Sequence, residues 1–351
     1  MKKITIIGNF SAYRNNLNGQ TMRTKSVYEV VQAYSTENGM KVKRMDTDKF
    51  QLGLKEIILF LKGLFNVCSS KNIILMPAHK AIKYTIPILY YINLFNKKNI
   101  HLVAIGGWLY DFLDNNKEYI KYFSRIEYVY VQSEKLKENV ETLGLKNVIY
   151  FPNFRDYPSL KSDKTNGMKK NNDVYHFVFF SRVLKEKGIE LAVNAINIYN
   201  SQNQKKIILD IYGPINDNYK SEFEGLLNER INYKGVLKPK NILDVLKNYE
   251  FMVFPTYYHG EGFPGALLDS LSSGVPVIAS DWKYNSEIIR DGYNGYIFES
   301  KSLEDLINTL EKAIANYDEL PEIRENCLLT ASQYSKNKVA PILLEKIKIF
   351  N

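Results

Sequence analysis

The sequence predicts an α/β protein of two Rossmann-like, doubly wound domains that face each other across a cleft. Three observations lead to this fold class. The length of 351 residues suggests two domains more readily than one. Short apolar runs alternate with helical stretches along the whole chain. A polar segment, 156–173, separates two series of this alternation.

The apolar runs have the character of buried parallel strands. They are rich in β-branched and aromatic residues, apolar on both faces, and followed by Gly, Ser, Asn or Pro. Ligands of such sheets bind beyond the carboxyl ends of the strands. We expect strands over 4–8, 72–77, 101–106, 128–133, 148–153, 176–181, 206–213, 251–256 and 275–280.

The middle segment sets the predicted domain boundary. DYPSLKSDKTNGMKKNND (156–173) carries Pro, Gly, Ser and Lys with almost no apolar residues, which is typical of a linker. The strand HFVFFS (176–181) then restarts the pattern. We therefore predict an N-terminal domain over 1–155 and a second domain over 156–334.

Composition narrows the class of protein. Hydrophobic residues make up 45% and charged residues 24%, as in an ordinary globular protein. Cys68 and Cys327 have no CxxC spacing, which argues against a disulfide framework or zinc site and fits a reducing cytoplasm. The apolar run in MKKITIIGNF is about five residues long, too short for a signal core. No segment offers the roughly 18 uninterrupted apolar residues of a transmembrane helix.

The net charge of +9 is unevenly distributed. Residues 1–155 carry 23 Lys and Arg against 12 Asp and Glu, a balance of +11, whereas residues 156–351 carry 24 against 26, a balance of −2. A basic first half suggests an anionic partner such as nucleic acid or an anionic membrane surface. A lysine-rich solvated surface explains the same charge equally well.

The stretch HGEGFPGALLDSLSSGVPVIASDW (259–282) carries the first chemical signal. It follows a predicted strand, and Gly262 and Gly265 let the backbone approach a ligand closely. Pro264 suits the first turn of the helix that follows. A strand, a glycine loop and a helix N-terminus together can hold a diphosphate. Glu261 then suits a group with hydroxyl donors, such as a sugar, and Asp269 suits a second such group, such as ribose. Helix capping by Glu261 and solvation of Asp269 is the alternative.

The stretch SRVLKEKGIELAVNAI (181–196) supplies cations. It follows the strand HFVFFS, and Arg182 and Lys187 fall in the loop before a helix of apolar period. An Arg fork and a Lys point charge at one strand end are usual partners of a diphosphate. Alone, this loop would be read as ordinary surface charge; two such loops in one domain favour a diphosphate site.

In order along the chain, SRVLKEKG, LDIYGP, YKGVL, EGFPGALLDSLSSGVPVIASDW and SEIIRDGYNGYIF resemble the C-terminal domain of retaining family-4 glycosyltransferases of the group 1 type, which have the GT-B fold. VYVQSEKLKENVETLGLKNVIYFPNF resembles the end of their N-terminal domain. The resemblance covers 125–350 well and 1–30 loosely. It also leads us to expect that a C-terminal helix, about 335–351, packs back on the first domain.

The resemblance implies roles for individual residues. Arg182 and Lys187 would hold the diphosphate of a nucleotide-sugar, and Glu261 would contact the donor sugar. The glycine-loop backbone would contact sugar and phosphate, Asp269 the ribose, and the turn 236–238 the nucleobase. The implied donor-binding residues besides Arg182, Lys187 and Glu261 are Gly262, Phe263, Pro264, Gly265, Asp269, Val236, Leu237 and Lys238.

The sequence departs from the family pattern at three places. Asp269 stands where the family has a glutamate one methylene longer. The segment VAIGGWLYD (103–111) lacks the histidine that members often carry, and NGQTMR (18–23) has one glycine where the family has two. These departures affect the acceptor side and leave the donor side intact. The candidate cleft and acceptor residues are Gly19, Gln20, Thr21, His79, Gly107, Trp108 and Asp111.

We expect no cofactor and no metal. GNFSAYRNNLNG (8–19) lacks the GxGxxG fingerprint of a dinucleotide site. Asp46, Thr47 and Asp48 form a D-x-D, but such triplets arise often by chance and this one lies in the wrong domain for the donor, so we interpret it as structural.

Two segments, 51–65 and 79–98, are apolar with interspersed lysines. In this fold, segments of this kind usually form crossover helices that face the core. With the basic charge of the first domain, they also fit helices lying on an anionic membrane surface. A transferase with a lipid-linked acceptor would use both features.

The sequence therefore predicts a cytoplasmic retaining glycosyltransferase (EC 2.4 class), with peripheral association at the inner face of a membrane as a further expectation. It would transfer a hexose-type sugar from a UDP- or GDP-sugar to a growing, lipid-linked glycan. Two alternatives remain: a sugar-nucleotide epimerase of the same architecture, and a degenerate glycosyltransferase that serves as a non-catalytic partner. Nucleic-acid binding is the weakest interpretation, because no recognised module accompanies the charge.

Overall fold

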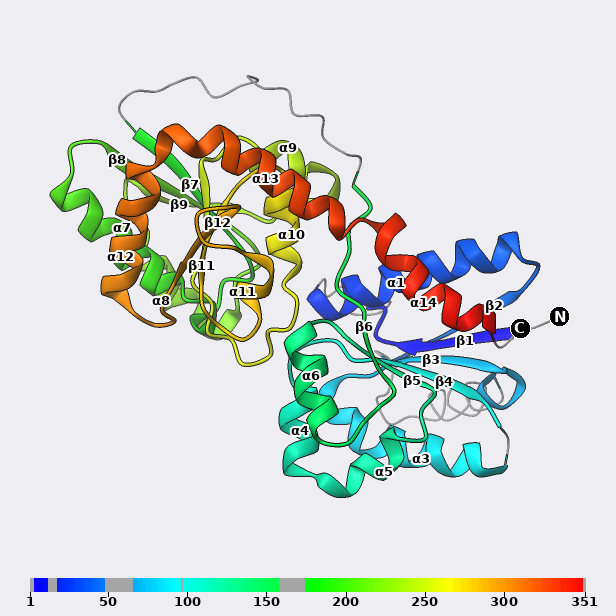
Figure 1. Ribbon diagram of the computed structural model, residues 1–351. Helices are drawn as coiled ribbons and strands as arrows, with labels where there is room; N and C mark the ends of the chain where they lie inside the picture. Colours follow the sequence, from blue (N-terminus) through cyan, green and yellow to red (C-terminus); the bar gives the residue numbers. More distant parts are fainter. Residues whose placement is uncertain (1–2, 12–17, 48–65, 96, 158–173, 350–351) are drawn as a thin grey trace. The chain divides into compact units, whose positions relative to one another are not determined.

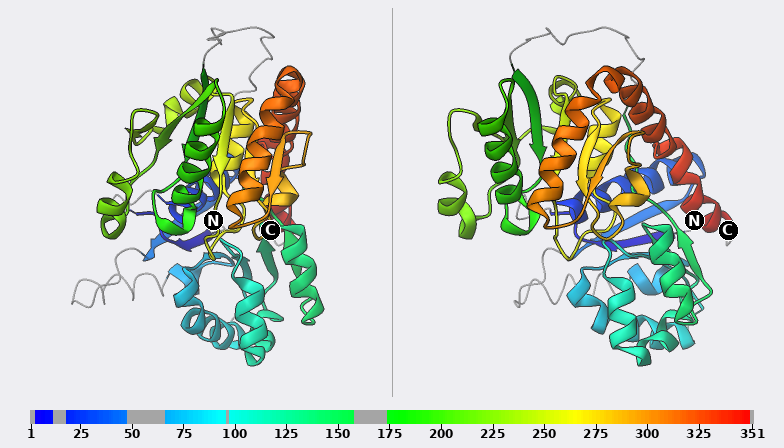
Figure 2. Two further views of the ribbon diagram at one scale, coloured as in Figure 1. Left: turned by 90° about the vertical axis from the view of Figure 1, so that its left-hand side faces the viewer. Right: turned by 60° about the vertical axis from the view of Figure 1, so that its left-hand side comes forward.

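The computed structural model describes residues 3–11, 18–47, 66–95, 97–157 and 174–349. It divides into two compact units, one made of Met1–Asn153 with Lys336–Asn351 and the other of Phe154–Ser335. Each unit contains a six-stranded sheet in which every strand pair is parallel. Figures 1 and 2 show helices on both faces of each sheet. The predicted α/β, doubly wound class is confirmed.

In the first unit the strand order is β2-β1-β3-β4-β5-β6. The helix α14 returns from the end of the chain and packs against α1 (Figure 1). The strands are β1 (Lys3–Gly8), β2 (Lys41–Asp46), β3 (Asn72–Met76), β4 (Asn99–Val103), β5 (Tyr128–Val131) and β6 (Val148–Tyr150). The α-helices are α1 (Gly19–Glu37), α3 (Ile82–Phe95), α4 (Leu109–Asn115), α5 (Ile120–Phe123), α6 (Glu134–Thr142) and α14 (Lys336–Ile349).

In the second unit the strand order is β12-β11-β10-β7-β8-β9. The strands are β7 (Val174–Phe180), β8 (Lys206–Tyr212), β9 (Ile231–Gly235), β10 (Phe251–Phe254), β11 (Val277–Ser280) and β12 (Gly295–Phe298). The α-helices are α7 (Ile189–Gln202), α8 (Lys220–Glu224), α9 (Ile242–Leu246), α10 (Gly265–Ser272), α11 (Asn285–Ile288), α12 (Leu303–Ala315) and α13 (Leu320–Gln333).

All nine predicted strands are present, and their burial explains their apolar sequences. Every residue of β3, β10 and β11 is buried, which explains their continuous apolar sequences. The three strands that the sequence did not predict, β2, β9 and β12, lie at sheet edges. An edge strand needs partners on one side only and can expose polar groups, as the half-exposed KVKRMD of β2 does.

The structure describes some of the segments for which we stated expectations from the sequence, and others lie outside the described residues. The division between the units falls at 153/154, two residues before the predicted boundary. The segment 51–65, Asp48 and most of the predicted linker lie outside the described residues. Asp46 accepts a hydrogen bond from the Phe10 N–H at 3.0 Å. In the part of the chain that is described, no helix combines the length and apolar character needed to cross a membrane.

Candidate functional site

Two loops of the second unit meet at the carboxyl edge of its sheet. Strands β7 and β10 are parallel neighbours, so the loops that follow them lie side by side. The first loop contains a 3-10 turn, η4 (Lys185–Lys187), and ends at Gly188 in the left-handed region, with φ +75°. A Cβ at Gly188 would stand 2.1 Å from the Pro255 carbonyl oxygen, so glycine makes the close approach possible. The Tyr257 N–H also donates to the Glu186 carbonyl at 2.8 Å.

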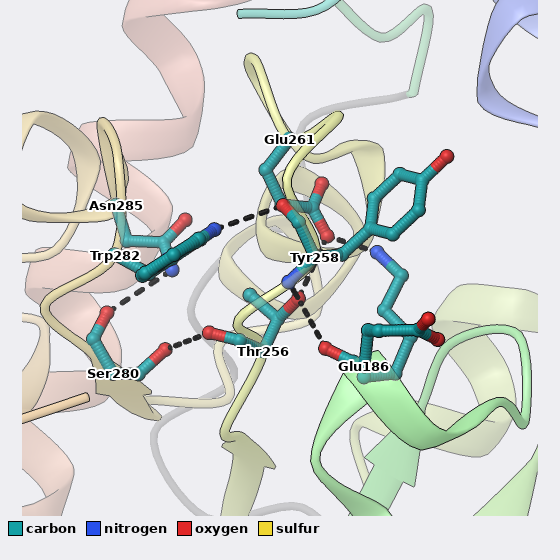
Figure 3. A network of polar contacts seen from close by, with 8 residues as sticks. Glu186, Thr256, Tyr258, Glu261, Ser280, Trp282 and Asn285 are labelled. Atoms are coloured by element: carbon teal, nitrogen blue, oxygen red, sulfur yellow. Dashed lines mark hydrogen bonds and ion pairs between the residues drawn. The ribbon is translucent and has the colours of Figure 1, made fainter. Parts of the chain in front are cut away.

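This approach brings Lys187 and Glu261 into a buried ion pair. The Lys187 ammonium donates to Glu261 Oε1, and the two side chains are only 7% and 8% exposed. The hydroxyl of Thr256 lies 3.0 Å from the same carboxylate oxygen (Figure 3). Removing two charges from water is costly, and close pairing with further hydrogen bonds offsets that cost. Two residues 74 positions apart, expected separately at diphosphate and sugar, thus form one cluster.

Hydrogen bonds from the end of β11 and from the loop after it fix the backbone behind this cluster. The Ser280 hydroxyl donates to the Thr256 carbonyl at 2.6 Å, and Asn285 Nδ2 donates to the Ser280 carbonyl at 3.1 Å (Figure 3). The Trp282 indole N–H donates to the Tyr258 carbonyl at 2.8 Å. The loop after β10 is therefore held on both sides, by the η4 loop and by β11.

Arg182 lies at the end of β7, two residues past its last position. Its guanidinium lies over the Tyr258 ring, 5.3 Å from the centroid, and Lys187 Nζ lies 5.1 Å from the same centroid. Among the described residues, no carboxylate forms an ion pair with Arg182. Two cations are therefore gathered at one ring, and the charge of Arg182 is not neutralised by an ion pair there.

The glycine loop leads into α10 as the sequence predicted. Gly262, Phe263 and Pro264 are buried, and α10 begins at Gly265 after Pro264 in an extended conformation. The described structure gives α10 no side-chain cap and no acidic residue in its first turn. The first N–H groups of this helix can therefore serve an anionic ligand, together with the helix dipole.

Asp269 is engaged with other protein groups. Arg155 Nε and Nη2 donate to its two oxygens at 2.5 and 3.1 Å, and the Tyr157 hydroxyl donates at 3.0 Å. Burial alone would lower the pKa of Arg155, but Asp269 raises it overall. Burial, followed by Asp269, raises the pKa of the Tyr157 hydroxyl. A ribose hydroxyl reaching Asp269 would share the carboxylate with these donors.

The Arg155 side chain also explains a glycine of the motif. A Cβ at Gly265 would stand 2.1 Å from Arg155 Nη2, so the guanidinium packs directly on the first residue of α10. The predicted nucleobase turn, 236–238, follows the edge strand β9, and Val236 is 62% exposed there. That turn lies at the same carboxyl edge of the sheet.

The candidate acceptor residues lie in the first unit, in two groups. The ring of His79, just after β3, stacks on Trp108, just after β4, at 4.7 Å between centroids. Asp111 follows in the first turn of α4, and Gly107 precedes Trp108. Neighbouring strand ends therefore bring these residues together.

The second group begins α1. Asn18 and Thr21 form a capping box, in which each side chain accepts from the other's N–H at 3.0 Å. Gly19 and Gln20 occupy the first positions of this helix. The Thr21 side chain is completely buried and helps to define the helix end.

The sequence did not single out Thr256, Tyr258, Arg155 or Tyr157. Thr256 and Tyr258 belong to the loop directly after a predicted strand, which was a usable signal. Arg155 and Tyr157 stand 114 and 112 positions from Asp269, and no local pattern connects them.

Comparison with known proteins supports a group 1 glycosyltransferase. Residues 160–328, just under half of the chain, match the family model "Glycosyl transferases group 1". The capsular polysaccharide biosynthesis glycosyltransferase CapH of Staphylococcus aureus is 26% identical over 271 residues, covering 66% of this chain and 74% of CapH. The GtfA subunit of the Streptococcus pneumoniae UDP-N-acetylglucosamine–peptide N-acetylglucosaminyltransferase is 26% identical over 204 residues, covering 53% of this chain and 39% of GtfA.

Solved structures establish the GT-B fold. Anabaena HepE in complex with UDP and glucose aligns with a TM-score of 0.73 at 14% identity, over 99% of this chain and 100% of HepE. Sucrose-phosphate synthase of Thermosynechococcus elongatus aligns with a TM-score of 0.76 at 13% identity, over 99% of each chain. At such low identity the likeness is one of fold.

The buried pair predicts strong energetic coupling between Lys187 and Glu261. Lys187→Met or Glu261→Leu alone should lower the free energy of unfolding by about 3–5 kcal/mol, because each leaves one buried charge uncompensated. The double variant should be less destabilised than the sum of the two by at least about 2 kcal/mol. Urea unfolding of the four proteins measures this.

The exposed pair Lys312–Asp291, at 2.8 Å with exposures of 52% and 47%, is the matched control. Its coupling should be about 0–1 kcal/mol. Equal coupling in the two pairs would contradict the buried-pair interpretation.

Proposed function

We propose that this protein is a retaining family-4 glycosyltransferase that transfers a hexose-type sugar from a UDP-sugar to a growing, lipid-linked glycan. The observation that carries the proposal is the cluster of Lys187, Glu261 and Thr256 with Arg182 beside it. It combines cations suited to a diphosphate with a carboxylate suited to sugar hydroxyls. It lies at the carboxyl edge of a parallel sheet, where ligands of this architecture bind.

UDP is the proposed nucleotide because it appears in the solved structures of fold neighbours. HepE was crystallised with UDP and glucose, and pneumococcal GtfA with UDP and GlcNAc. GDP remains the second choice. The turn at 236–238 is the segment that we propose to border the base of either nucleotide. We propose that Asp269 contacts the ribose while it stays bound to Arg155 and Tyr157.

The proposed chemistry keeps the configuration of the sugar. The bond between the anomeric carbon and the diphosphate oxygen breaks through an oxocarbenium-like transition state, and the acceptor oxygen bonds to the same face. The departing phosphate oxygen takes the acceptor's proton. Arg182, Lys187 and the first N–H groups of α10 stabilise the negative charge that develops on the diphosphate. Because these groups supply that charge stabilisation, we propose that transfer needs no metal ion.

Lys187 can serve the diphosphate without leaving Glu261. An ammonium carries three N–H donors, and the pair with Glu261 uses one of them. Glu261 likewise retains an oxygen, Oε2, for a donor-sugar hydroxyl. The pair would thus hold sugar and diphosphate in fixed relation to each other.

The first unit is the proposed acceptor side, with His79, Trp108 and Asp111 as acceptor contacts. We propose that it works at the inner, anionic face of a membrane. The helix α3 supports this: it buries Ile82, Ile86 and Leu89 and exposes another, largely apolar, face. The large apolar side chains that α3 exposes are Tyr84, Ile88, Tyr91, Leu94 and Phe95, with exposures of 74%, 50%, 55%, 54% and 91%.

Nucleotide binding tests the proposed donor class. Melting temperatures are measured with UDP, GDP, ADP and dTDP at one common concentration, set at about 100 times the dissociation constant of UDP. We expect UDP to stabilise the protein by about 2.7 kcal/mol, which raises the melting point by a few degrees. Transfer from the corresponding UDP-sugars should then persist in EDTA. If none of the four nucleotides shifted the melting point, the transferase proposal would fail.

Vesicle binding tests the membrane proposal. The double variant Tyr91→Ser/Phe95→Ser should bind phosphatidylglycerol vesicles at least about tenfold more weakly, because burying one large apolar side chain contributes about 1.5–3 kcal/mol. The control is Leu329→Ser, which removes a 58% exposed leucine from the second unit. Sedimentation with vesicles gives the affinities, and equal binding by both variants would contradict the role of α3.

A further inference from the structure

The ring of Tyr258 contacts both cations proposed to hold the diphosphate. The Arg182 guanidinium carbon lies 5.3 Å from the ring centroid, and Lys187 Nζ lies 5.1 Å from it. Cations within about 6 Å of an aromatic centroid are attracted by the negative face of the ring. One aromatic side chain therefore links the loop after β7, which carries both cations, to the loop after β10.

The position of this ring is fixed by its own loop. The Tyr258 N–H donates to the Thr256 hydroxyl at 3.2 Å, and the Tyr258 carbonyl accepts from the Glu261 N–H at 3.0 Å and from the Trp282 indole at 2.8 Å. A Cβ at Gly260 would stand 2.7 Å from ring atom Cε1, so the ring packs over a glycine that leaves it room.

Apart from the Tyr258 ring, the two cations differ in their contacts with carboxylates. Lys187 is bound to Glu261, which fixes its ammonium. For Arg182, the described residues provide the Tyr258 ring but no carboxylate in an ion pair. An arginine held by a ring keeps its guanidinium donors unneutralised, whereas a carboxylate would compete with a phosphate for the same donors.

We infer that Tyr258 is a positioning residue of the diphosphate site, which holds Arg182 and Lys187 at the ring without neutralising them. The inference rests on the proposed function and deepens it. It predicts that losing the ring weakens recognition of the diphosphate and leaves recognition of the nucleoside unchanged. A residue that only packed the loop would affect both ligands alike.

The test compares two ligands in each variant. The ligands are the nucleoside diphosphate that the wild type binds most tightly among UDP, GDP, ADP and dTDP, and the corresponding nucleoside. Tyr258→Leu should weaken diphosphate binding about tenfold, which corresponds to two lost cation–π contacts, with nucleoside affinity unchanged. Tyr258→Phe keeps the ring and should restore diphosphate affinity to within about twofold of the wild type.

Tyr257 provides a matched control. Its ring contacts Lys301 at 5.2 Å, a cation outside the proposed site, so Tyr257→Leu removes the same kind of contact one residue away. Its diphosphate affinity should equal that of the wild type. If Tyr258→Leu folds poorly, Gly260→Ala serves in its place, because the added Cβ would displace the Tyr258 ring. This variant should likewise lose affinity for the diphosphate and keep its affinity for the nucleoside.

The outcomes separate the two proposals. A wild type that binds none of the nucleotides would overturn the proposed function and this inference with it. A wild type that binds one of them, combined with a Tyr258→Leu variant whose affinities for diphosphate and nucleoside are unchanged or fall in equal proportion, would overturn the role of Tyr258 alone.

Discussion

The buried ion pair between Lys187 and Glu261 is the interaction on which the candidate site depends. Adjacent parallel strands and a left-handed glycine at 188 bring its two loops together, and the Thr256 hydroxyl lies 3.0 Å from the Glu261 carboxylate. Burying two charges costs several kcal/mol for each ion, and an apolar pair of similar volume often serves stability as well. Stability alone therefore does not account for charges at this position. The proposed recognition of a nucleotide-sugar would account for them, because both groups retain capacity for hydrogen bonds to such a ligand.

The ends of the second unit converge on the same loop and helix. Arg155, near its beginning, binds Asp269 and packs on Gly265, while its N–H donates to the Tyr334 carbonyl at 3.1 Å. The ring of Tyr334, near the end of the unit, packs edge to face on Phe263 at 4.9 Å. The glycine loop and α10 are thus supported by chain segments nearly the whole unit apart. This support fixes the loop that would face the donor, in addition to the contacts from η4 and β11.

Much of this could be predicted from sequence, because buried parallel strands and glycine loops leave local patterns. The interior strands of both sheets were predicted, as was the edge strand β6, whereas the edge strands β2, β9 and β12 were not. An edge strand needs partners on one side only, so its sequence carries a weaker pattern. Arg182, Lys187 and Glu261 were predicted as site residues from their loops. Their arrangement was not, because the pairing of Lys187 with Glu261 and of Arg155 with Asp269 depends on tertiary contacts between residues 74 and 114 positions apart.

The central claim is that Glu261 recognises the donor sugar while Lys187 and Arg182 recognise the diphosphate. Calorimetric titration of Glu261→Gln with UDP, and with the UDP-sugar that the wild type binds most tightly, tests it most directly. The substitution keeps the side-chain volume and an acceptor for Lys187. We predict that UDP binds the variant as tightly as the wild type or more tightly, because Lys187 has lost its counter-charge, and that the UDP-sugar loses its advantage over UDP. If the affinities for UDP and UDP-sugar fell together, this division of roles would be contradicted.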